Sequence, residues 1–210
     1  MKKVKVGIIG VGNMGSGHAR MFTNGSCPDF ELTAICDINP DRLAACLKMI
    51  EGECAKNGRD LPEVKTFTDA IEMLDAGILD AVTVAVPHYS HPKYVIAAIE
   101  RGIHVVCEKP AGVYTKQVRE MNAVADQHPE VTFAMMFNQR TDCVYRKMKE
   151  IISSGRLGEI KRVNWIITNW YRPQCYYDSG AWRATWSGEG GGVLLNQCPH
   201  QLDLWQWICG

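Results

Sequence analysis

Three glycines, Gly10, Gly12 and Gly15, have the spacing G-x-G-x-x-G and follow directly on a run of apolar residues. A turn with this spacing lets backbone N–H groups at the start of a helix approach a phosphate group closely. Asp37 ends the next apolar run, about 20 residues further along, where a carboxylate can accept hydrogen bonds from ribose hydroxyls and repel a 2′-phosphate. The pattern predicts a dinucleotide site that prefers NAD to NADP. Arg42 could partly restore NADP binding, and Asp37 could instead cap the following helix.

Short strands and helices alternate up to about residue 137 and would hold this turn in place. We expect strands over 4–10, 30–36, 64–67, 80–86, 103–108 and 131–137, and helices over 13–24, 39–48, 69–75, 92–101 and 115–127. Short apolar strands alternating with helices are typical of a parallel sheet covered on both faces. The sequence therefore predicts an α/β fold, a Rossmann doubly wound parallel sheet, for residues 1–137.

The pattern changes after residue 138. We expect a helix over 141–154, a longer strand over 160–171, an aromatic and arginine-rich loop over 171–186, a glycine cluster over 188–192, and a helix over 193–210 with an irregularity at Pro199. One strand with two helices makes a poor domain, because the strand's edges stay unpaired and its faces uncovered. Residues 138–210 are therefore predicted to be a partial α+β second domain, and the chain a fragment of something longer.

The overall charge argues against several classes of partner. Lysine plus arginine and aspartate plus glutamate both total 23, so the net charge is zero, and nothing favours a nucleic acid or an anionic membrane surface. The lysine-rich N-terminus superficially resembles a signal peptide, but Lys5 and the closely spaced glycines interrupt its apolar stretch. The sequence also lacks an uncharged apolar stretch near the roughly 20 residues of a membrane span. We expect a cytoplasmic chain with neither a nucleic-acid nor a membrane partner.

Cysteine and histidine give little support for a metal site. The nine cysteines include no C-x-x-C pair and several lie within apolar runs, which favours reduced, buried thiols over zinc binding or a thiol nucleophile. His88 and His91 have the spacing of a metal pair, but no further ligand cluster accompanies them. We expect no metal, and we expect His91 to cap the next helix or to contact the cofactor.

The turn Glu108-Lys109-Pro110 ends the fifth expected strand and resembles the EKP signature of the glucose–fructose oxidoreductase and inositol dehydrogenase family (Gfo/Idh/MocA). The resemblance extends through residues 85–112, the MFNQR stretch at 136–140, the pair Trp182-Arg183, and GGGVLLNQCPHQLD at 190–203. It covers all 210 residues in order. Family members resemble a Rossmann domain followed by a domain built on a large open sheet, which implies that residues 138–210 begin a substrate-binding and oligomerisation domain.

The resemblance implies three catalytic residues, Lys109, His200 and Asn196. Lys109 corresponds to the family's catalytic-site lysine, and its ammonium group could hydrogen-bond the substrate oxygen and stabilise alkoxide character. His200 corresponds to the catalytic histidine, which would take the hydroxyl proton as hydride leaves for the nicotinamide. The alternatives to these catalytic roles are an exposed lysine at position 109 and a paired or packed helix histidine at position 200.

Asn196 and Asp203 would lie on the same helix face as His200, at i−4 and i+3. Many family members have an aspartate where this sequence has Asn196. An asparagine can orient an imidazole or bind a hydroxyl, but it cannot offset an imidazolium charge. Asp203 could serve instead, or it could simply solvate the helix.

The resemblance also implies a wider set of cofactor contacts, on the glycine turn, on the loops after the strands and on a loop of the second domain. These residues are Asn13, Met14, Pro87, His91, Glu108, Lys109, Asn138, Trp182 and Arg183. Aromatic residues of the loop at 171–186 either pack together or form a stacking platform for a sugar.

These features together predict an NAD-dependent oxidoreductase acting on a sugar, cyclitol or related polyol. A non-catalytic dinucleotide-binding regulator on the same fold is an alternative, because a fold does not establish function. A biliverdin-type reductase that shares EKP is disfavoured by the GGG…His…Asp ending. A full-length form is expected to be a homo-oligomer. The 210-residue form is expected to have little activity, because the substrate-facing sheet is absent.

Overall fold

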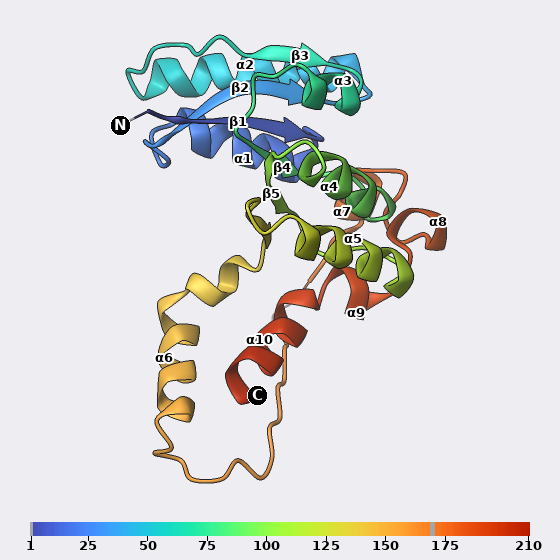
Figure 1. The fold of residues 1–210 in the computed structure, drawn as a ribbon. Coiled ribbons are helices and arrows are strands. Elements are labelled where there is room, and N and C mark those ends of the chain that lie inside the picture. Colours follow the sequence, from blue (N-terminus) through green and yellow to red (C-terminus); the bar gives the residue numbers. More distant parts are fainter. Residues whose placement is uncertain (1, 169–170) are drawn as a thin grey trace. The chain divides into compact units, whose positions relative to one another are not determined.

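The structure is a computed structural model that describes residues 2–168 and 171–210 (Figure 1). The chain divides between Met136 and Phe137 into two compact units. We describe each unit by itself.

The first unit is built on a six-stranded sheet whose strand pairs are all parallel. Its strand order is β3-β2-β1-β4-β5-β6. The strands are β1 (Val4–Ile9), β2 (Phe30–Cys36), β3 (Lys65–Phe67), β4 (Ala81–Val84), β5 (His104–Cys107) and β6 (Phe133–Met135). The predicted Rossmann sheet is confirmed, and each expected strand is present, although several are shorter than predicted.

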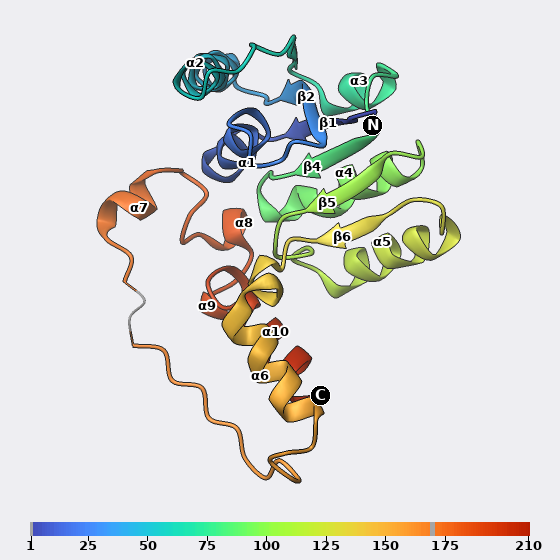
Figure 2. The same ribbon diagram turned by 90° about the vertical axis from the view of Figure 1, so that its left-hand side faces the viewer.

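Helices cover both faces of this sheet (Figure 2). Those on one face are α1 (Asn13–Thr23) and α2 (Pro40–Lys56), and those on the other are α3 (Ala70–Asp75), α4 (His91–Ile99) and α5 (Thr115–Gln127). The short 3₁₀ turn η1 (His88–Ser90) precedes α4. The expected end of the second helix at Lys48 is wrong: α2 continues to Lys56, because Ile50 and Cys54 extend its buried stripe at helical spacing.

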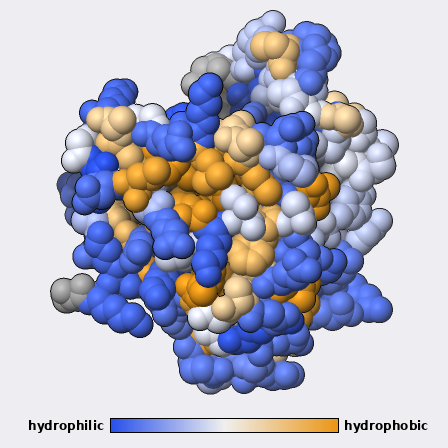
Figure 3. All heavy atoms as spheres, turned by 90° about the horizontal axis from the view of Figure 1, so that it is seen from above, coloured by the Kyte–Doolittle hydropathy of each residue, from blue (hydrophilic) through white to orange (hydrophobic). Residues whose placement is uncertain are grey.

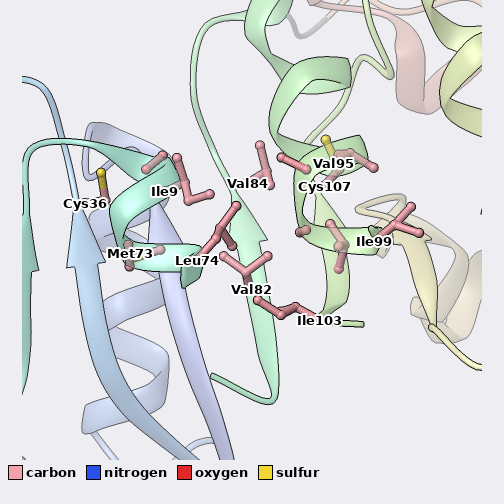
Figure 4. Close-up of a cluster of buried hydrophobic side chains, with 14 of the residues drawn as sticks. Ile9, Cys36, Met73, Leu74, Val82, Val84, Val95, Ile99, Ile103 and Cys107 are labelled. Atoms are coloured by element: carbon pink, nitrogen blue, oxygen red, sulfur yellow. The ribbon is translucent and has the colours of Figure 1, made fainter. Parts of the chain in front are cut away.

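Two apolar clusters fill the space between the sheet and its helices. Val82 and Val84 of β4 lie between side chains of α3 and α4 in the larger cluster (Figure 4). The smaller cluster joins Ile8 and Ile35 of the sheet to α1 and α2. Burying an aliphatic side chain of this kind contributes about 1.5–3 kcal/mol, so these clusters fix the strands whose ends form the site.

The strand order creates a switch point in the sheet. β2 and β3 lie on one side of β1, while β4, β5 and β6 lie on the other. The connections from β1 and β4 therefore leave the sheet toward opposite faces, and ligands of such sheets bind outside the carboxyl ends of the two strands at this point. The glycine turn follows β1, so it lies at this switch point.

The regular secondary structure of the second unit consists of helices in the residues that the structure describes. It contains η2 (Asn138–Thr141), α6 (Cys143–Ser153), α7 (Gln174–Asp178), α8 (Trp186–Glu189), α9 (Val193–Asn196) and α10 (Pro199–Cys209). The expected strand over 160–171 is wrong for 160–168 and 171, which pair with no other strand among the described residues, and 169–170 lie outside that part of the chain. The expected loop over 171–186 contains a short helix, α7.

The last predicted helix is interrupted. α9 ends at Asn196 and α10 begins at Pro199, which occupies the first helical turn, where its missing N–H costs nothing. A single helix over 193–210 is therefore wrong, while the expected irregularity at Pro199 is confirmed.

Exposed apolar side chains are present on both units. Ile38 in the first unit is 84 % exposed and Ile166 in the second is 83 % exposed. The space-filling view in Figure 3 likewise has hydrophobic surface among hydrophilic side chains. Among the described residues, no helix has the length and apolar composition needed to cross a bilayer.

Candidate active site

The glycine turn between β1 and α1 uses its first and third glycines for backbone packing. Gly10 has φ +90°, and a Cβ atom there would lie 2.6 Å from the carbonyl oxygen of Ala85. A Cβ atom on Gly15 would lie 1.8 Å from the carbonyl oxygen of Gly10. Any side chain at either position would therefore disrupt the turn.

Gly12 differs from both, since a Cβ atom there would meet no atom of the described residues within 4 Å. The first turn of α1, which the structure describes completely, contains no acidic residue, and Met14 within it is 55 % exposed. A helix N-terminus with accessible N–H groups favours an anion. The turn therefore fits the pyrophosphate of a dinucleotide, with Asn13 and Met14 at its rim.

Asp37 follows β2 and is 6 % exposed. Its Oδ2 accepts a hydrogen bond from the backbone N–H of Val11 at 3.0 Å, and its Oδ1 accepts one from the N–H of Asn39 at 2.9 Å. The carboxylate thus joins the glycine turn to the start of α2, and its further lone pairs suit ribose hydroxyls. The cap alternative for Asp37 is wrong, because Asn39 is the N-cap and its side chain accepts from the N–H of Asp41. Arg42 Nη1 lies 3.9 Å from Asp37 Oδ2.

Lys109 is half-buried and follows β5 directly, at the carboxyl edge of the sheet. The preceding Glu108 is 5 % exposed, and its Oε1 lies 2.8 Å from Nε2 of His18 in α1. Glu108 is therefore held by another side chain of the protein, a contact that the predicted cofactor role did not foresee.

His91, the first residue of α4, is 1 % exposed. Its Nδ1 lies 2.6 Å from the carbonyl oxygen of Pro110, and its Nε2 lies 2.7 Å from that of Val86. Burial lowers the pKa of His91 and outweighs these two contacts, which favour the protonated ring. The N-cap of α4 is Ser90 and not His91, so the predicted helix cap is wrong, while the alternative contact with the cofactor stays a prediction.

The described part of the chain contains no group of three or more histidine, cysteine, aspartate or glutamate side chains that could hold a metal ion. The rings of His88 and His91 lie 6.0 Å apart between centroids, and Cys36 and Cys107 are buried. Burial raises the pKa of Cys36 to about 12, so this thiol stays protonated.

His200 lies in the first turn of α10 in the second unit. Its ring meets that of Phe137 edge to face, with centroids 5.9 Å apart and an angle of 85° between the ring planes. The break between α9 and α10 separates His200 from Asn196, so the two do not share one continuous helix as expected.

Asn196 and Asp203 have different partners in this unit. Asn196, 4 % exposed, donates through Nδ2 to Oε1 of Glu189, which is 6 % exposed. Asp203 accepts two hydrogen bonds from Arg140, at 2.8 Å and 2.5 Å. This bidentate contact raises the pKa of Arg140. Asp203 is therefore part of an ion pair rather than only a solvated helix residue.

Arg183 belongs to a cluster around Tyr176. Its Nη1 donates to the Tyr176 hydroxyl at 2.7 Å, and its Cζ lies 4.2 Å from the Tyr176 ring and 4.7 Å from the Trp182 ring. Gln197 Nε2 also donates to the Tyr176 hydroxyl, at 3.0 Å. The aromatic loop therefore packs on its own arginine side chains.

Two further predicted residues lie at the surface. Pro87 is exposed and precedes η1, and Asn138 is exposed at the start of η2.

Sequence reasoning missed His18 and Glu189. His18 lies three positions after Gly15, on the helix whose start forms the glycine turn, so its place on that helix could have indicated it. Glu189 is the acidic residue within the glycine cluster at 188–192. A single charged residue among glycines could have indicated that this side chain has a specific partner.

Comparison with protein families gives two matches along the chain. Residues 4–136 match the model described as "Oxidoreductase family, NAD-binding Rossmann fold", and residues 145–210 match a "GFO/IDH/MocA C-terminal domain". The two ranges fall within the first and second structural units, respectively.

Three individual proteins that resemble this chain are a catabolism protein and two dehydrogenases. The rhizopine catabolism protein MocA of Rhizobium meliloti is 27 % identical over 211 residues, which cover 100 % of this chain and 58 % of that protein. The WlbA dehydrogenase of Bordetella pertussis, solved with NADH and UDP-GlcNAcA, is 29 % identical with a TM-score of 0.80, covering 100 % of this chain and 56 % of that one. Scyllo-inositol dehydrogenase of Lactobacillus casei, solved with NAD(H) and scyllo-inositol, is 26 % identical with a TM-score of 0.78, covering 99 % and 56 %. The chain spans about half the length of the curated relatives it matches.

Proposed function

Because the chain belongs to the oxidoreductase family with an NAD-binding Rossmann fold, we propose that it transfers hydride between NAD and a sugar, cyclitol or related polyol. The observation that supports this most directly is the glycine turn, where Gly12 leaves open space in front of the N-terminus of α1. When bound there, the dinucleotide would supply the hydride acceptor.

The preference for NAD over NADP rests on Asp37. Its buried carboxylate adds negative charge beside the glycine turn, where it would accept hydrogen bonds from the ribose hydroxyls and repel a 2′-phosphate. Arg42, 3.9 Å from this carboxylate, acts in the opposite direction, but its side chain is 51 % exposed and its charge is screened by solvent.

Lys109 and His200 would divide the proton chemistry. Lys109 would donate a hydrogen bond to the substrate oxygen and so stabilise its developing negative charge. His200 would accept the hydroxyl proton while the C–H bond gives up its hydride, and in the reverse direction it would return that proton. A positioned acid or base of this kind contributes roughly 100- to 10,000-fold in rate.

The test combines NADH binding with a single-turnover assay. NADH fluorescence gives the dissociation constant, and enzyme stoichiometric with NAD reports one round of NADH formation from each of a panel of polyols. Lys109→Gln should keep NADH affinity and lose roughly 100-fold or more in the single-turnover rate. The matched control is Lys116→Gln, whose side chain is 87 % exposed in α5 and which should keep both.

Each outcome has a definite meaning. Equal rates for Lys109→Gln and the unaltered chain would overturn the role of Lys109. Absence of NADH binding would overturn the cofactor site. Tight NADH binding without NADH formation from any polyol would support the non-catalytic regulator instead.

A further inference from the structure

Lys109 lies between two residues that are each held by a histidine from another part of the first unit. On one side, Oε1 of Glu108 lies 2.8 Å from Nε2 of His18. On the other, the carbonyl oxygen of Pro110 lies 2.6 Å from Nδ1 of His91. The segment that presents the lysine is therefore anchored at both ends.

The contact between His18 and Glu108 connects elements that are not neighbours in the sheet. His18 belongs to α1, which follows β1, whereas Glu108 follows β5, and β4 lies between these two strands. The side chains are 13 % and 7 % exposed, and a carboxylate withdrawn from water to this degree is costly unless it is paired. The pair therefore ties the helix of the glycine turn to the lysine segment.

His91 makes a second connection, between the loops after β4 and β5. With 1 % exposure, its ring contacts the carbonyl of Val86 at 2.7 Å as well as that of Pro110. Both loops lie at the carboxyl edge of the sheet, where ligands of this fold bind. The ring thus fixes the spacing between the two loops on either side of it.

We propose that His18 and His91 are positioning residues for Lys109, which set where its ammonium group stands relative to the glycine turn. This rests on the proposed function, in which that ammonium group meets the substrate oxygen. A lysine side chain is long and flexible, so the backbone on either side limits where its charge can go. Displacing a catalytic group by about 1 Å can cost on the order of 100-fold in rate.

The first experiment substitutes His18, because an apolar side chain in place of the buried His91 would remove a hydrogen-bond donor from the carbonyls of Val86 and Pro110 and could unfold the unit. His18→Leu removes the hydrogen bond to Glu108, whereas His18→Gln keeps an N–H donor at the end of the side chain. The matched control is His128→Leu, which breaks an exposed histidine–glutamate pair, since His128 lies 3.0 Å from Glu130 at the surface.

Three measurements follow each variant: the NADH affinity, and then the single-turnover rate and the lysine labelling at saturating NAD. His18→Leu should lower the single-turnover rate by about 10- to 100-fold with NADH affinity within roughly twofold. His18→Gln should recover most of that rate, and His128→Leu should leave it unchanged. Acetic anhydride labelling of the peptide containing Lys109, relative to that containing Lys116, should rise by roughly threefold or more in His18→Leu as the segment loosens.

The labelling separates this inference from the proposed function, because it needs no turnover. Unchanged labelling of Lys109 in His18→Leu would overturn the inference, as would a rate loss explained entirely by weaker NADH binding. If His18→Leu fails to fold, the measurement moves to Glu108→Gln, where a folded variant with unchanged labelling would also overturn it. Altered labelling without polyol turnover in any form would leave the positioning intact and refute the proposed function.

Discussion

Replacing Gly12 or Gly15 by alanine adds the same methyl group to the same turn, yet the first change should act on NADH affinity and the second on the stability of the fold. At Gly12 the new Cβ atom would meet none of the described atoms within 4 Å, while at Gly15 it would lie 1.8 Å from the carbonyl oxygen of Gly10. The first change probes the space assigned to the pyrophosphate, and the second probes the packing of the fold.

The magnitudes follow from these distances. An ordinary contact of about 3.4 Å would require the Gly15 variant to move its backbone by roughly 1.6 Å, and overpacking of this kind costs about 1–3 kcal/mol or more. At about 2–4 °C per kcal/mol, the melting temperature should fall by roughly 2–12 °C. Gly12 is the N-cap of α1, where alanine in place of glycine costs less than about 1 kcal/mol, so this variant should melt within about 4 °C of the unaltered chain.

Gly12→Ala should weaken cofactor binding although the turn itself keeps its structure. A methyl group against the pyrophosphate would carry an overpacking cost of about 1–3 kcal/mol, which is roughly a 5- to 150-fold loss of NADH affinity. NADH fluorescence titration and thermal melting on the two variants check both halves of the argument. Unchanged NADH affinity in Gly12→Ala would refute the assignment of this space, and an unchanged melting temperature in Gly15→Ala would refute the packing argument.

Three further outcomes are expected. At pH 8, iodoacetamide should label the exposed Cys143 and Cys175 but not Cys36 in the folded chain, because burial raises the pKa of Cys36 to about 12. Mass spectrometry of the labelled peptides measures this difference, and equal labelling of the three cysteines would contradict it. Burial lowers the pKa of His91 from its usual 6.5. The contribution of the neutral ring to the free energy of unfolding should therefore be fully present above pH 6.5. It should fall as the pH drops from there toward the folded-state pKa, because in that range the unfolded chain takes up a proton and the folded chain does not. Urea unfolding at pH 8 and pH 5.5 measures this loss, which should be smaller in His91→Gln. Asp37→Ala should reduce the ratio of NAD to NADP affinity by on the order of tenfold, and an unchanged ratio in paired titrations would exclude a selective role for its carboxylate.

Much of the first unit follows from local patterns. The apolar strands alternate with helices, and the glycine turn lies between the first strand and the first helix. The parallel sheet could therefore be predicted from the pattern of residues that are neighbours in the sequence. The end of α2 was harder to predict, because Gly52 lies in its interior while Ile50 and Cys54 continue the buried stripe on either side. Tertiary burial there outweighed the low helix propensity of glycine.

The second unit shows why alternation alone does not make a strand. Residues 160–168 alternate apolar and polar side chains only in part, Ile166 is 83 % exposed, and this stretch has no ladder partner in the described parts of the chain. A strand exists only through its backbone partners, and these can come from anywhere in a sequence. A period of two therefore predicts extended backbone more securely than it predicts a sheet.

Contacts between distant residues were the least predictable part of the site. Motifs identify residues by their neighbours in the chain, so they indicated Glu108 and Lys109 but not His18, which lies 90 positions from Glu108. The residues that hold a catalytic group in place are chosen by proximity in the fold, and a single sequence contains no direct record of that proximity.

In the second unit, contacts that a single sequence does not record also bear on Asn196, which stands where many family members have an aspartate. The sequence left open whether Asn196 or Asp203 accompanies His200. Asp203 accepts two hydrogen bonds from Arg140, so its charge is already offset by a guanidinium. Asn196 donates its amide N–H to the buried carboxylate of Glu189, which turns its side-chain oxygen to the opposite side of the amide group as an acceptor. An acceptor suits an imidazole N–H or a polyol hydroxyl, and the negative charge that asparagine lacks lies one hydrogen bond away on Glu189. The loss of a carboxylate at position 196 is therefore weaker evidence against catalysis than the sequence alone suggests.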